Sequence, residues 1–504
     1  MIVSAVETAI HEGLVTLILY NRWILLGAIL FLLGCISTSP LPTDSPAPTA
    51  PSNFTPTPPA TPTSTPEPGT GAPGIGDTYY TTLGNGGYDV ETYALVLDID
   101  PPANTLNGQV QLQATATEQL ITFNLDLVDL TVDAITVNGE PALFSINENE
   151  LTITPNQPLM PGDEFQVSVL YHGMPGLIRT EAAPFEIGWS HSPDGAINVW
   201  SEPAAASSWF PNNNHPRDKA TYQFEITVPD PWMVAATGSL QNTIQQNGST
   251  TYIWEMNEPM ATYLASISVD QYDVVTGTAS NGILIRNYFP MDYPAVERQA
   301  YDIIPEVLVF LEELFGPYPF DEYGVVVTSQ AGICDKAMLA LEGQSLSLHC
   351  PFMNAENVVV HEIAHQWFGN SVSLENWQDI WLKEGFATYA EWLWNSQNDP
   401  AAIALAARAY RESSFDSQFP VAGPSRRDLY TIKSYFGGAI VLQALREEVG
   451  EETFFAIVRT YAERYRYGVA GTDEFISVAE EISGRNLDEF FNEWIFSSLL
   501  PELP

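Results

Sequence analysis

The chain has 504 residues, of which 45% are hydrophobic, enough to form more than one folded domain. Lysine and arginine number 18 against 62 aspartate and glutamate residues, and the resulting net charge of −44 excludes nucleic-acid binding as the main function. Such acidity is typical of a soluble surface in an extracytoplasmic or saline setting.

The first feature in chain order is an apolar run of 11 residues, Trp23–Leu33, which has the length of a signal-peptide core and is short for a membrane span. It leads into Cys35 through the letters LLGC, which resemble a bacterial lipoprotein box. The alternative joins residues 14–20 to this run as one uncleaved anchor helix, with Arg22 as an unfavourable charge inside it. Either way, residues 1–35 are predicted to be a signal peptide or membrane anchor, and the protein is predicted to be extracytoplasmic and anchored to the cell membrane.

Residues 36–76 are dominated by proline, threonine, serine and alanine. A segment of this composition cannot bury a hydrophobic core, and its prolines favour a semi-extended chain. We therefore predict a disordered linker that reaches about 100 Å at most and holds the folded part away from the membrane.

Residues 77–275 contain short runs of alternating polar and apolar residues between turn signals such as Asn138-Gly139. This pattern predicts an N-terminal antiparallel β domain, built as a sandwich or a saddle-shaped sheet. The strand candidates are Tyr93–Ile99, Gln109–Ala116, Phe165–Tyr171, Thr221–Val228 and Thr251–Trp254.

The hydrophobic period becomes helical within residues 276–504, although a few strands are expected between 280 and 350. This part is therefore predicted to be an α+β, mostly helical domain, and the chain as a whole to be multidomain. The helix candidates are Val296–Phe315, Ala355–Gly369, Lys383–Trp394, Ala401–Ser413, Lys433–Val449, Glu451–Arg464 and Asp473–Ile482.

The second domain carries histidines and glutamates at metal-ligand spacing. His361 and His365 lie four residues apart on a predicted helix, so their imidazoles face the same side and can bind one ion. Glu384 follows after 18 residues on a second predicted helix and can supply a third ligand. Two imidazoles, one carboxylate and an open position for water form the ligand set of a catalytic zinc ion, so we predict one Zn²⁺ per chain.

Glu362 lies about 100° around the helix from His361, beside the metal, where a general base is needed. The sequence thus predicts a zinc hydrolase in which Glu362 deprotonates a zinc-bound water. Asp379, five residues before Glu384, is a candidate partner for a ligand imidazole, or else a solvated loop carboxylate.

The motif HExxH, followed after 18 residues by glutamate in the context Trp-Leu-x-Glu-Gly-Phe-Ala, resembles the M1 family of zinc aminopeptidases. These are gluzincins related to aminopeptidase N and leukotriene A4 hydrolase, and the resemblance implies a thermolysin-like catalytic domain behind an N-terminal β domain. The chain ends where this family often adds a β-sandwich and a large helical domain, so a truncated form with a more open cleft is implied. The resemblance covers the chain from about residue 80 onward and includes Gly87–Ile99, Ser201–Pro203, Trp209–Pro211, His215–Ala220, Phe315–Phe320 and Thr472–Pro501.

Three more residues receive roles from this resemblance. Tyr435 matches the tyrosine that donates a hydrogen bond to the tetrahedral oxyanion, or else it is a core tyrosine. Glu342 matches the glutamate of the family's G-x-M-E-N strand, and Glu202 matches its partner from the N-terminal domain. Together they would bind the free α-amine of a peptide substrate. The alternative is that both are ordinary solvated carboxylates.

The sequence departs from the family pattern near these residues. Leu339, Leu341 and Gly343 replace the glycine, methionine and asparagine of G-x-M-E-N, while Gly437 replaces a lysine and Asn214 an aspartate. These changes leave the zinc chemistry in place and bear on the strictness of the exopeptidase preference.

Cys334 and Cys350 flank Glu342 and are the only cysteines besides the lipidation candidate. In an exported protein they can form a disulfide worth about 3 kcal/mol, or they can remain two buried thiols.

The sequence therefore predicts a zinc metallopeptidase, and the resemblance implies an aminopeptidase that acts on peptides with a free N-terminus. One alternative is a zinc endopeptidase or broader amidase without strict N-terminal specificity. Another is a surface binding protein that has lost the chemistry. No nucleic-acid partner is expected, and the expected form is a monomer tethered to a membrane through its N-terminus.

Overall fold

The computed structural model describes residues 69–180, 185–329, 332–335, 340–414, 419–424, 426 and 429–503. The predicted anchor at residues 1–35 and most of the predicted linker at 36–76 lie outside these ranges. None of the helices within them is long and apolar enough to cross a membrane.

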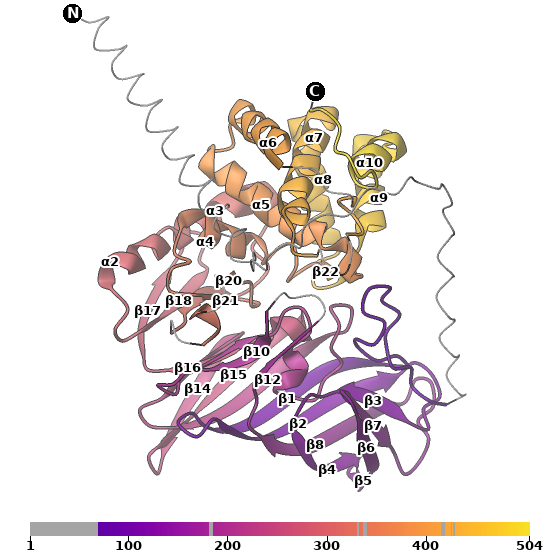
Figure 1. The fold of residues 1–504 in the computed structure, drawn as a ribbon, viewed down its shortest axis with the longest axis vertical. Coiled ribbons are helices and arrows are strands. Elements are labelled where there is room, and N and C mark those ends of the chain that lie inside the picture. Colours follow the sequence, from indigo (N-terminus) through magenta and orange to yellow (C-terminus); the bar gives the residue numbers. More distant parts are fainter. Residues whose placement is uncertain are drawn as a thin grey trace, which may run out of the picture. The chain divides into compact units, whose positions relative to one another are not determined.

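An eight-stranded sheet dominates the N-terminal half (Figure 1). Along its strands buried and exposed residues alternate, as expected of a sheet with one face on the core. Each of the predicted strands lies within one of its members, so the prediction of a β-rich N-terminal domain is confirmed. In sheet order the strands are β14 (Ser239–Gln246), β15 (Ser249–Ala261), β12 (Lys219–Pro229), β1 (Tyr88–Asp100), β2 (Thr105–Ala116), β8 (Glu164–Gly173), β4 (Thr131–Val137) and β5 (Glu140–Pro141).

One pair of strands departs from the antiparallel prediction. Strands β1 and β12 run parallel, with Thr92 opposite Thr221 and Asp98 opposite Thr227. Parallel neighbours need a long connection, and residues 101–218 between these strands provide it. That connection also contains the other strands of this half up to β11.

Two smaller sheets complete the N-terminal half. Strand β11 is fully buried and ends two residues before Glu202, so it fixes the position of this glutamate. The five-stranded sheet has the order β13 (Met233–Ala236), β16 (Ile267–Asp270), β11 (Ile197–Trp200), β10 (Ile187–His191) and β9 (Leu177–Ile178), and the three-stranded sheet has the order β3 (Phe123–Asp126), β7 (Glu150–Thr154) and β6 (Leu143–Asn147).

The C-terminal half begins with a mixed five-stranded sheet. Strands β18, β19 and β21 pair in parallel, and the other pairs are antiparallel. In sheet order they are β17 (Tyr272–Thr278), β18 (Leu284–Pro290), β19 (Glu322–Val327), β21 (Leu346–His349) and β20 (Ala340–Leu341). A two-residue strand pair, β22 (Ser373–Leu374) and β23 (Val469–Ala470), connects two loops among the helices.

Helices form the rest of the C-terminal half, which confirms the mostly helical second domain. Apolar residues at helical spacing bury one stripe of each longer helix. The helices are α2 (Ala295–Arg298), α3 (Ile304–Phe315), α4 (Glu356–Ala364), α5 (Trp381–Asn395), α6 (Pro400–Ser414), α7 (Gly438–Val449), α8 (Glu451–Arg464), α9 (Thr472–Ser483) and α10 (Asp488–Trp494).

Some predicted helices are interrupted or shorter than expected. The candidate at 296–315 is divided into α2, a short 3₁₀ turn and α3, because Pro305 lacks an N–H and favours a new helix start. The candidate at 355–369 ends as α4 at Ala364, and the chain then turns through Gly369, whose φ is +121°. Residues 433–437, predicted as α-helix, form a single π-helical turn before α7.

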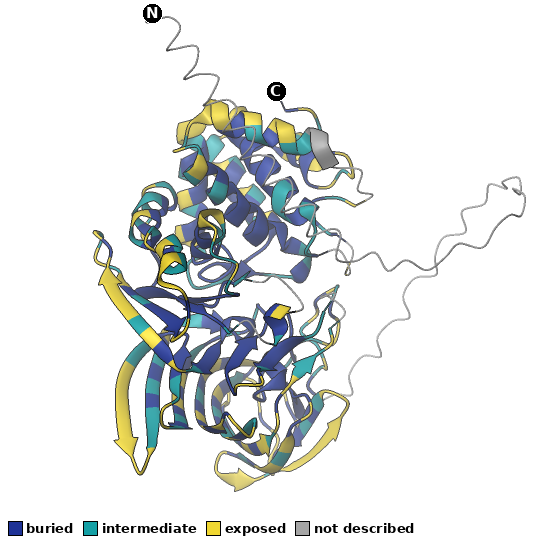
Figure 2. Ribbon diagram, turned by 60° about the vertical axis from the view of Figure 1, so that its left-hand side comes forward, coloured by how far each residue is buried: buried dark blue, intermediate teal, exposed yellow. Residues whose placement is uncertain are grey.

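Burial is uneven between the edges and the interior of the molecule (Figure 2). The edge strands β14 and β6 are largely exposed, and the exposed side chains of β6 include Leu143 and Ile146. In contrast, α5 buries twelve of its 15 residues, which makes it the most enclosed of the longer helices around the site.

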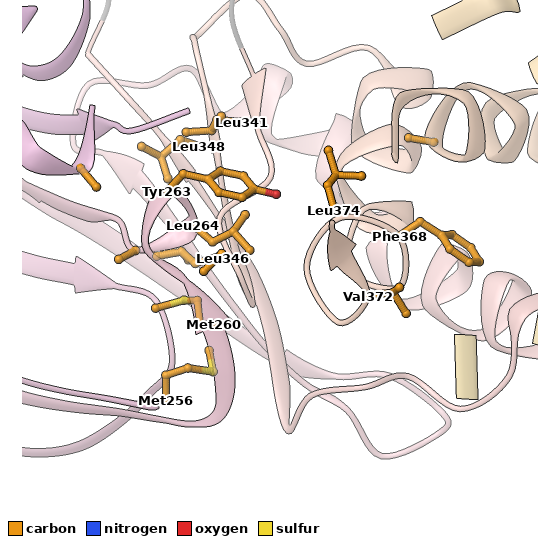
Figure 3. Close-up of a cluster of buried hydrophobic side chains, with 14 of the residues drawn as sticks. Met256, Met260, Tyr263, Leu264, Leu341, Leu346, Leu348, Phe368, Val372 and Leu374 are labelled. Carbon is orange, nitrogen blue, oxygen red and sulfur yellow. The ribbon is translucent and has the colours of Figure 1, made fainter. Parts of the chain in front are cut away.

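The apolar core continues from the N-terminal half into the C-terminal half (Figure 3). Met256 and Met260 of β15 and Tyr263 just after it belong to the same buried cluster as Leu341 and Leu346 of the mixed sheet. The Tyr263 hydroxyl donates to the carbonyl of Gly369, 3.3 Å away, in the turn that follows α4. The position of Tyr263 is therefore fixed by both halves.

The segment before β1 also binds both halves, through the side chain of Asp77. Its carboxylate accepts hydrogen bonds from the backbone N–H groups of Tyr79, Tyr80 and Trp377 and contacts Nε2 of His215 at 3.1 Å. Asp77 is buried, which would raise its pKa, but these hydrogen bonds lower the pKa to about 2.

Candidate active site

Helices α4 and α5 bring the three predicted metal ligands together. His361 Nε2 and His365 Nε2 lie 3.2 Å and 3.6 Å from Glu384 Oε2. One ligand atom from each residue lies within 4.8 Å of the others. For metal–ligand bonds of about 2.1 Å, tetrahedral coordination separates the ligand atoms by about 3.4 Å, so the set fits a zinc ion.

The outer nitrogens of both imidazoles are also held. His361 Nδ1 lies 2.8 Å from Glu391 Oε1, and His365 Nδ1 lies 3.1 Å from the carbonyl of Phe368. Such contacts fix the tautomer, leaving Nε2 of each ring for a metal. Glu391 was not predicted as a site residue. Its position seven residues after Glu384, which places both on one face of α5, is the signal that could have identified it.

The structure places Asp379 away from the imidazoles. Its Oδ1 accepts hydrogen bonds from the backbone N–H and the hydroxyl of Thr472, the first residue of α9. Neither sequence interpretation of this residue is therefore correct, since Asp379 is buried and acts as a cap for α9.

Glu362 lies on α4 between the two histidines. Its side chain is buried, and its Oε2 has no hydrogen-bond partner among the described residues. Burial raises the pKa of Glu362 to about 8. A buried carboxylate with one free oxygen next to a metal site can exchange a proton with a water molecule.

Tyr435 lies in the π-helical turn at 433–437, where such turns often accompany functional sites. Its ring stacks on that of His361, with centroids 5.8 Å apart and an interplanar angle of 18°. Burial raises the pKa of Tyr435 well above its usual range, and the Glu384 charge adds to this effect, so the phenol remains a hydrogen-bond donor at neutral pH.

The predicted amine-binding residues Glu202 and Glu342 also come together, but a lysine lies between them. The ammonium of Lys383 donates to Glu202 Oε1 and to Glu342 Oε1, and lies 3.4 Å from Glu384 Oε1. The Lys383 side chain has no exposed surface. We call Glu202, Glu342 and Lys383 the carboxylate cluster.

The carboxylate cluster is rigidly supported from α4 and the turn after it. Asn370 Nδ2 donates to the carbonyl of Glu342 at 2.7 Å, and Gln366 Nε2 donates to the carbonyl of Gly343 at 3.3 Å. Burial alone would lower the pKa of Lys383, but the carboxylates of Glu202, Glu342 and Glu384 raise it well above its usual range. The lysine is therefore a permanent cation in the site.

Several departures from the family pattern have local explanations. A Cβ on Gly343 would lie 2.4 Å from the backbone oxygen of Leu346, so only glycine fits this tight turn. Leu341 belongs to the buried core, and Asn214 accepts a hydrogen bond from Thr262 while donating to the Ala204 carbonyl. Leu339 lies outside the described residues. At Gly437 a Cβ would lie 3.1 Å from Cγ of Lys433 and 3.3 Å from Cγ2 of Val421, so a side chain there would be crowded.

Cys334 and Cys350 are joined by a disulfide, with their Cα atoms 5.6 Å apart. The sequence left open a disulfide or two buried thiols, and the structure contains the disulfide. Since Cys350 directly follows β21, whose neighbour β20 leads into Glu342, the bridge closes the chain around the segment that presents this glutamate.

Comparisons with known proteins agree with this architecture. Residues 89–264 match the family model described as Peptidase M1 N-terminal domain, and residues 299–494 match the Peptidase family M1 domain. Aminopeptidase M1-A of Oryza sativa subsp. japonica is 25% identical over 442 residues, which cover 79% of this chain and 49% of the rice protein. Leucyl aminopeptidase of Saccharolobus solfataricus is 24% identical over 429 residues, covering 81% of this chain and 53% of the relative. The chain thus spans about half the length of the curated relatives that it matches.

Solved structures match over nearly their full length. An M1 zinc metallopeptidase from Deinococcus radiodurans has a TM-score of 0.79 and 31% identity, and the match covers 86% of this chain and 98% of that one. A variant of the same enzyme bound to the peptide Tyr-Ser-Ala has a TM-score of 0.79 and 30% identity, with 86% and 99% covered.

Proposed function

Because the chain belongs to peptidase family M1, whose structural neighbours are zinc metallopeptidases, we propose that it is a zinc-dependent aminopeptidase that hydrolyses N-terminal residues from peptides. The observation that carries this proposal is the convergence of His361 Nε2, His365 Nε2 and Glu384 Oε2 beside the unpartnered oxygen of Glu362. This arrangement supports hydrolysis by an activated water.

The residues of this chain divide the reaction between them. His361, His365 and Glu384 would hold a zinc ion, which supplies a Lewis acid that activates water and polarises the scissile carbonyl. Glu362 accepts the proton of the attacking water and returns it to the departing amine. Tyr435 donates a hydrogen bond to the oxygen that becomes negative when the carbonyl is attacked.

A second candidate function is a peptidase without strict selection for a free N-terminus. One contact favours it, namely the Lys383 ammonium between Glu202 and Glu342, the two residues expected to bind a substrate amine. Both candidates use the same metal ligands and the same base, and they differ only in what the carboxylate cluster recognises.

We further propose that the protein is a monomer outside the cytoplasm, tethered to a membrane through its N-terminal segment. The disulfide between Cys334 and Cys350 and the net charge of −44 support an extracytoplasmic setting. Expressing the full chain and a Cys35→Ser variant with a radiolabelled fatty acid tests the lipid tether. Label on both proteins, or on neither, contradicts it. Light scattering of the purified protein measures its mass.

The hydrolytic function is tested with an aminoacyl anilide, measured with and without a chelator. We expect activity that disappears with the chelator and returns with added zinc. The Glu362→Gln variant should keep its zinc and lose at least about 10²-fold in turnover, because it cannot accept a proton. Folded protein that binds no zinc and cleaves no peptide substrate, even with the metal added, would disprove the proposal.

A further inference from the structure

The chain contains four lysines in 504 residues, and one of them lies inside the active site. We propose that Lys383 determines how strongly this enzyme selects a free amino terminus. Its ammonium lies between Glu202 and Glu342, so both carboxylates already share a cationic partner before the α-ammonium of a substrate arrives. The inference rests on the proposed peptidase function and widens its substrate class beyond free N-termini to peptides whose scissile residue carries an acylated amine, which includes internal peptide bonds.

The lysine lies beside the reacting atoms. Glu342, Glu362 and His365 each offer an atom within 4.8 Å of the others, so the carboxylate cluster adjoins both the base and a metal ligand. Lys383 immediately precedes Glu384 on α5, and its ammonium is 3.4 Å from the outer oxygen of that ligand. The Lys383 ammonium therefore lies where it would meet the part of a substrate next to the scissile bond.

The surroundings are shaped to hold the lysine in this position. Its stem lies along Gly369, where an added Cβ would be in van der Waals contact with Lys383, 3.4 Å from its Cβ and 3.6 Å from its Cδ. The ammonium lies 5.6 Å from the centre of the Tyr263 ring, which favours a cation. Because the Tyr263 hydroxyl donates to the Gly369 carbonyl, the aromatic face and the glycine beside the lysine stem are held together.

Charge balance explains the expected effect on substrates. A second ammonium in the carboxylate cluster would meet the first at close range, and like charges in a buried site repel strongly. A substrate with a free amine must therefore share the carboxylates with Lys383 or displace the lysine from them. Either way, the new ion pair of the substrate replaces or weakens the existing ion pairs of Lys383, so little binding energy is gained. An acylated amine loses nothing, because it carries no charge and leaves the existing ion pairs intact.

The half-buried Lys219 and the buried Lys433 show that enclosure of a lysine alone does not produce this arrangement. Lys219 is bonded to the carbonyls of Asn370, Ser371 and Gly468, and Lys433 to those of Phe419 and Ser498. No carboxylate contact is recorded for either ammonium among the described residues. Lys219 is thus a control for removing a half-buried cation whose partners are carbonyl oxygens.

The test compares a short peptide anilide that has a free amino terminus with its N-acetylated twin, using the zinc-loaded enzyme. For wild type we expect kcat/KM values that differ by no more than about tenfold. In Lys383→Met, which keeps the length of the side chain and removes its charge, the ratio should shift toward the free amine by at least about tenfold, mainly through a lower KM. Lys219→Met should leave the ratio as in wild type.

Two outcomes would overturn the inference about Lys383 and leave the proposed peptidase function intact. The first is a wild-type preference for the free amine above about a hundredfold, and this measurement decides the matter even if Lys383→Met does not fold. The second is a folded, zinc-loaded Lys383→Met enzyme with an unchanged ratio. If neither peptide is cleaved in a zinc-dependent manner, the proposed function fails and the inference fails with it.

Discussion

The three metal ligands and the carboxylate cluster are neighbours in the active site, but the chain assembles them over different distances. His361, His365 and Glu384 lie on consecutive helices, and the two ends of this set are 23 positions apart. Lys383 reaches Glu342 across 41 positions and Glu202 across 181. Helix periodicity and one connection determine the ligands, whereas the cluster exists only after both halves of the molecule have packed together.

The two groups also differ in the source of their positive charge. The ligand set has its carboxylate positioned for a cation from solution, while the carboxylate cluster takes its cation from the chain itself. Substitutions that damage one group and spare the other therefore test whether they work independently.

Removing a metal ligand should have the largest effect. His365→Ala leaves two ligands, so the protein should purify without stoichiometric zinc and lose hydrolysis of free-amine and N-acetylated peptides alike. Elemental analysis and both rate assays measure this. His191→Ala, which removes an imidazole bonded to the Pro101 carbonyl outside the ligand set, is the control. Full zinc content in His365→Ala would show that the ligand set is wrong.

Removing the hydroxyl of Tyr435 should lower kcat without changing the zinc content. In Tyr435→Phe we expect kcat to fall by about 10²- to 10³-fold, since one donor to the developing oxyanion is lost. Zinc content should stay at the wild-type level, and KM should change little. A kcat within a few-fold of wild type would mean that Tyr435 serves only to pack against His361.

Weakening the support of His361 should lower metal affinity more than turnover. Glu391→Gln replaces the carboxylate at His361 Nδ1, and outer partners of this kind contribute about 10- to 100-fold to zinc affinity. Competition with a chromogenic chelator measures the affinity, and saturating zinc should restore most of the activity. Asn357→Ala is the matched control, because it removes the other contact of Glu391 and leaves His361 in place. Equal zinc affinities for wild type and Glu391→Gln would contradict the assignment.

The smallest expected effect is on stability at low pH, and it comes from Asp77, which belongs to neither the metal ligands nor the carboxylate cluster. Its pKa is about 2 in the folded protein against 3.8 for an unperturbed carboxyl, so its contribution to stability is complete above pH 3.8 and is lost as the pH falls toward 2. Between pH 5 and pH 2 the free energy of unfolding of wild type should fall by about 1–2 kcal/mol more than that of Asp77→Asn. Denaturant unfolding at both pH values measures the difference, with the exposed Asp98→Asn as control. Equal losses in wild type and Asp77→Asn would rule out this contribution.

The features that could be predicted from the sequence are those that depend on interactions between residues close together in the chain. The ligands and Glu362 were predictable because a helix places residues i and i+4 on one face. The strands of the large sheet were predictable because alternation reports on one buried face. Glu391 is local as well, two turns after Glu384, but a carboxylate closer in sequence, Asp379, drew the assignment instead.

The parts that could not be predicted depend on contacts across the chain. The family resemblance implies that Glu202 and Glu342 converge, but nothing in the sequence around Lys383 shows that its side chain turns toward them. That direction depends on the Tyr263 ring and on the space left by Gly369, which arrive from other segments. Similarly, the parallel pairing of β1 with β12 depends on the course of more than a hundred intervening residues.

The hydrogen bonds of Asp77 have a mechanical consequence. The residue lies eleven positions before β1, and its carboxylate holds the backbone of Trp377, just ahead of the helix that carries Glu384. A pull on the preceding chain first loads the backbone hydrogen bonds that tie Gly69 and Gly71 to residues 121 and 122, and only beyond them the contacts of Asp77 with His215 and Trp377. Asp77 is therefore a second point of attachment, at which the chain that enters the folded part is held by both halves at once.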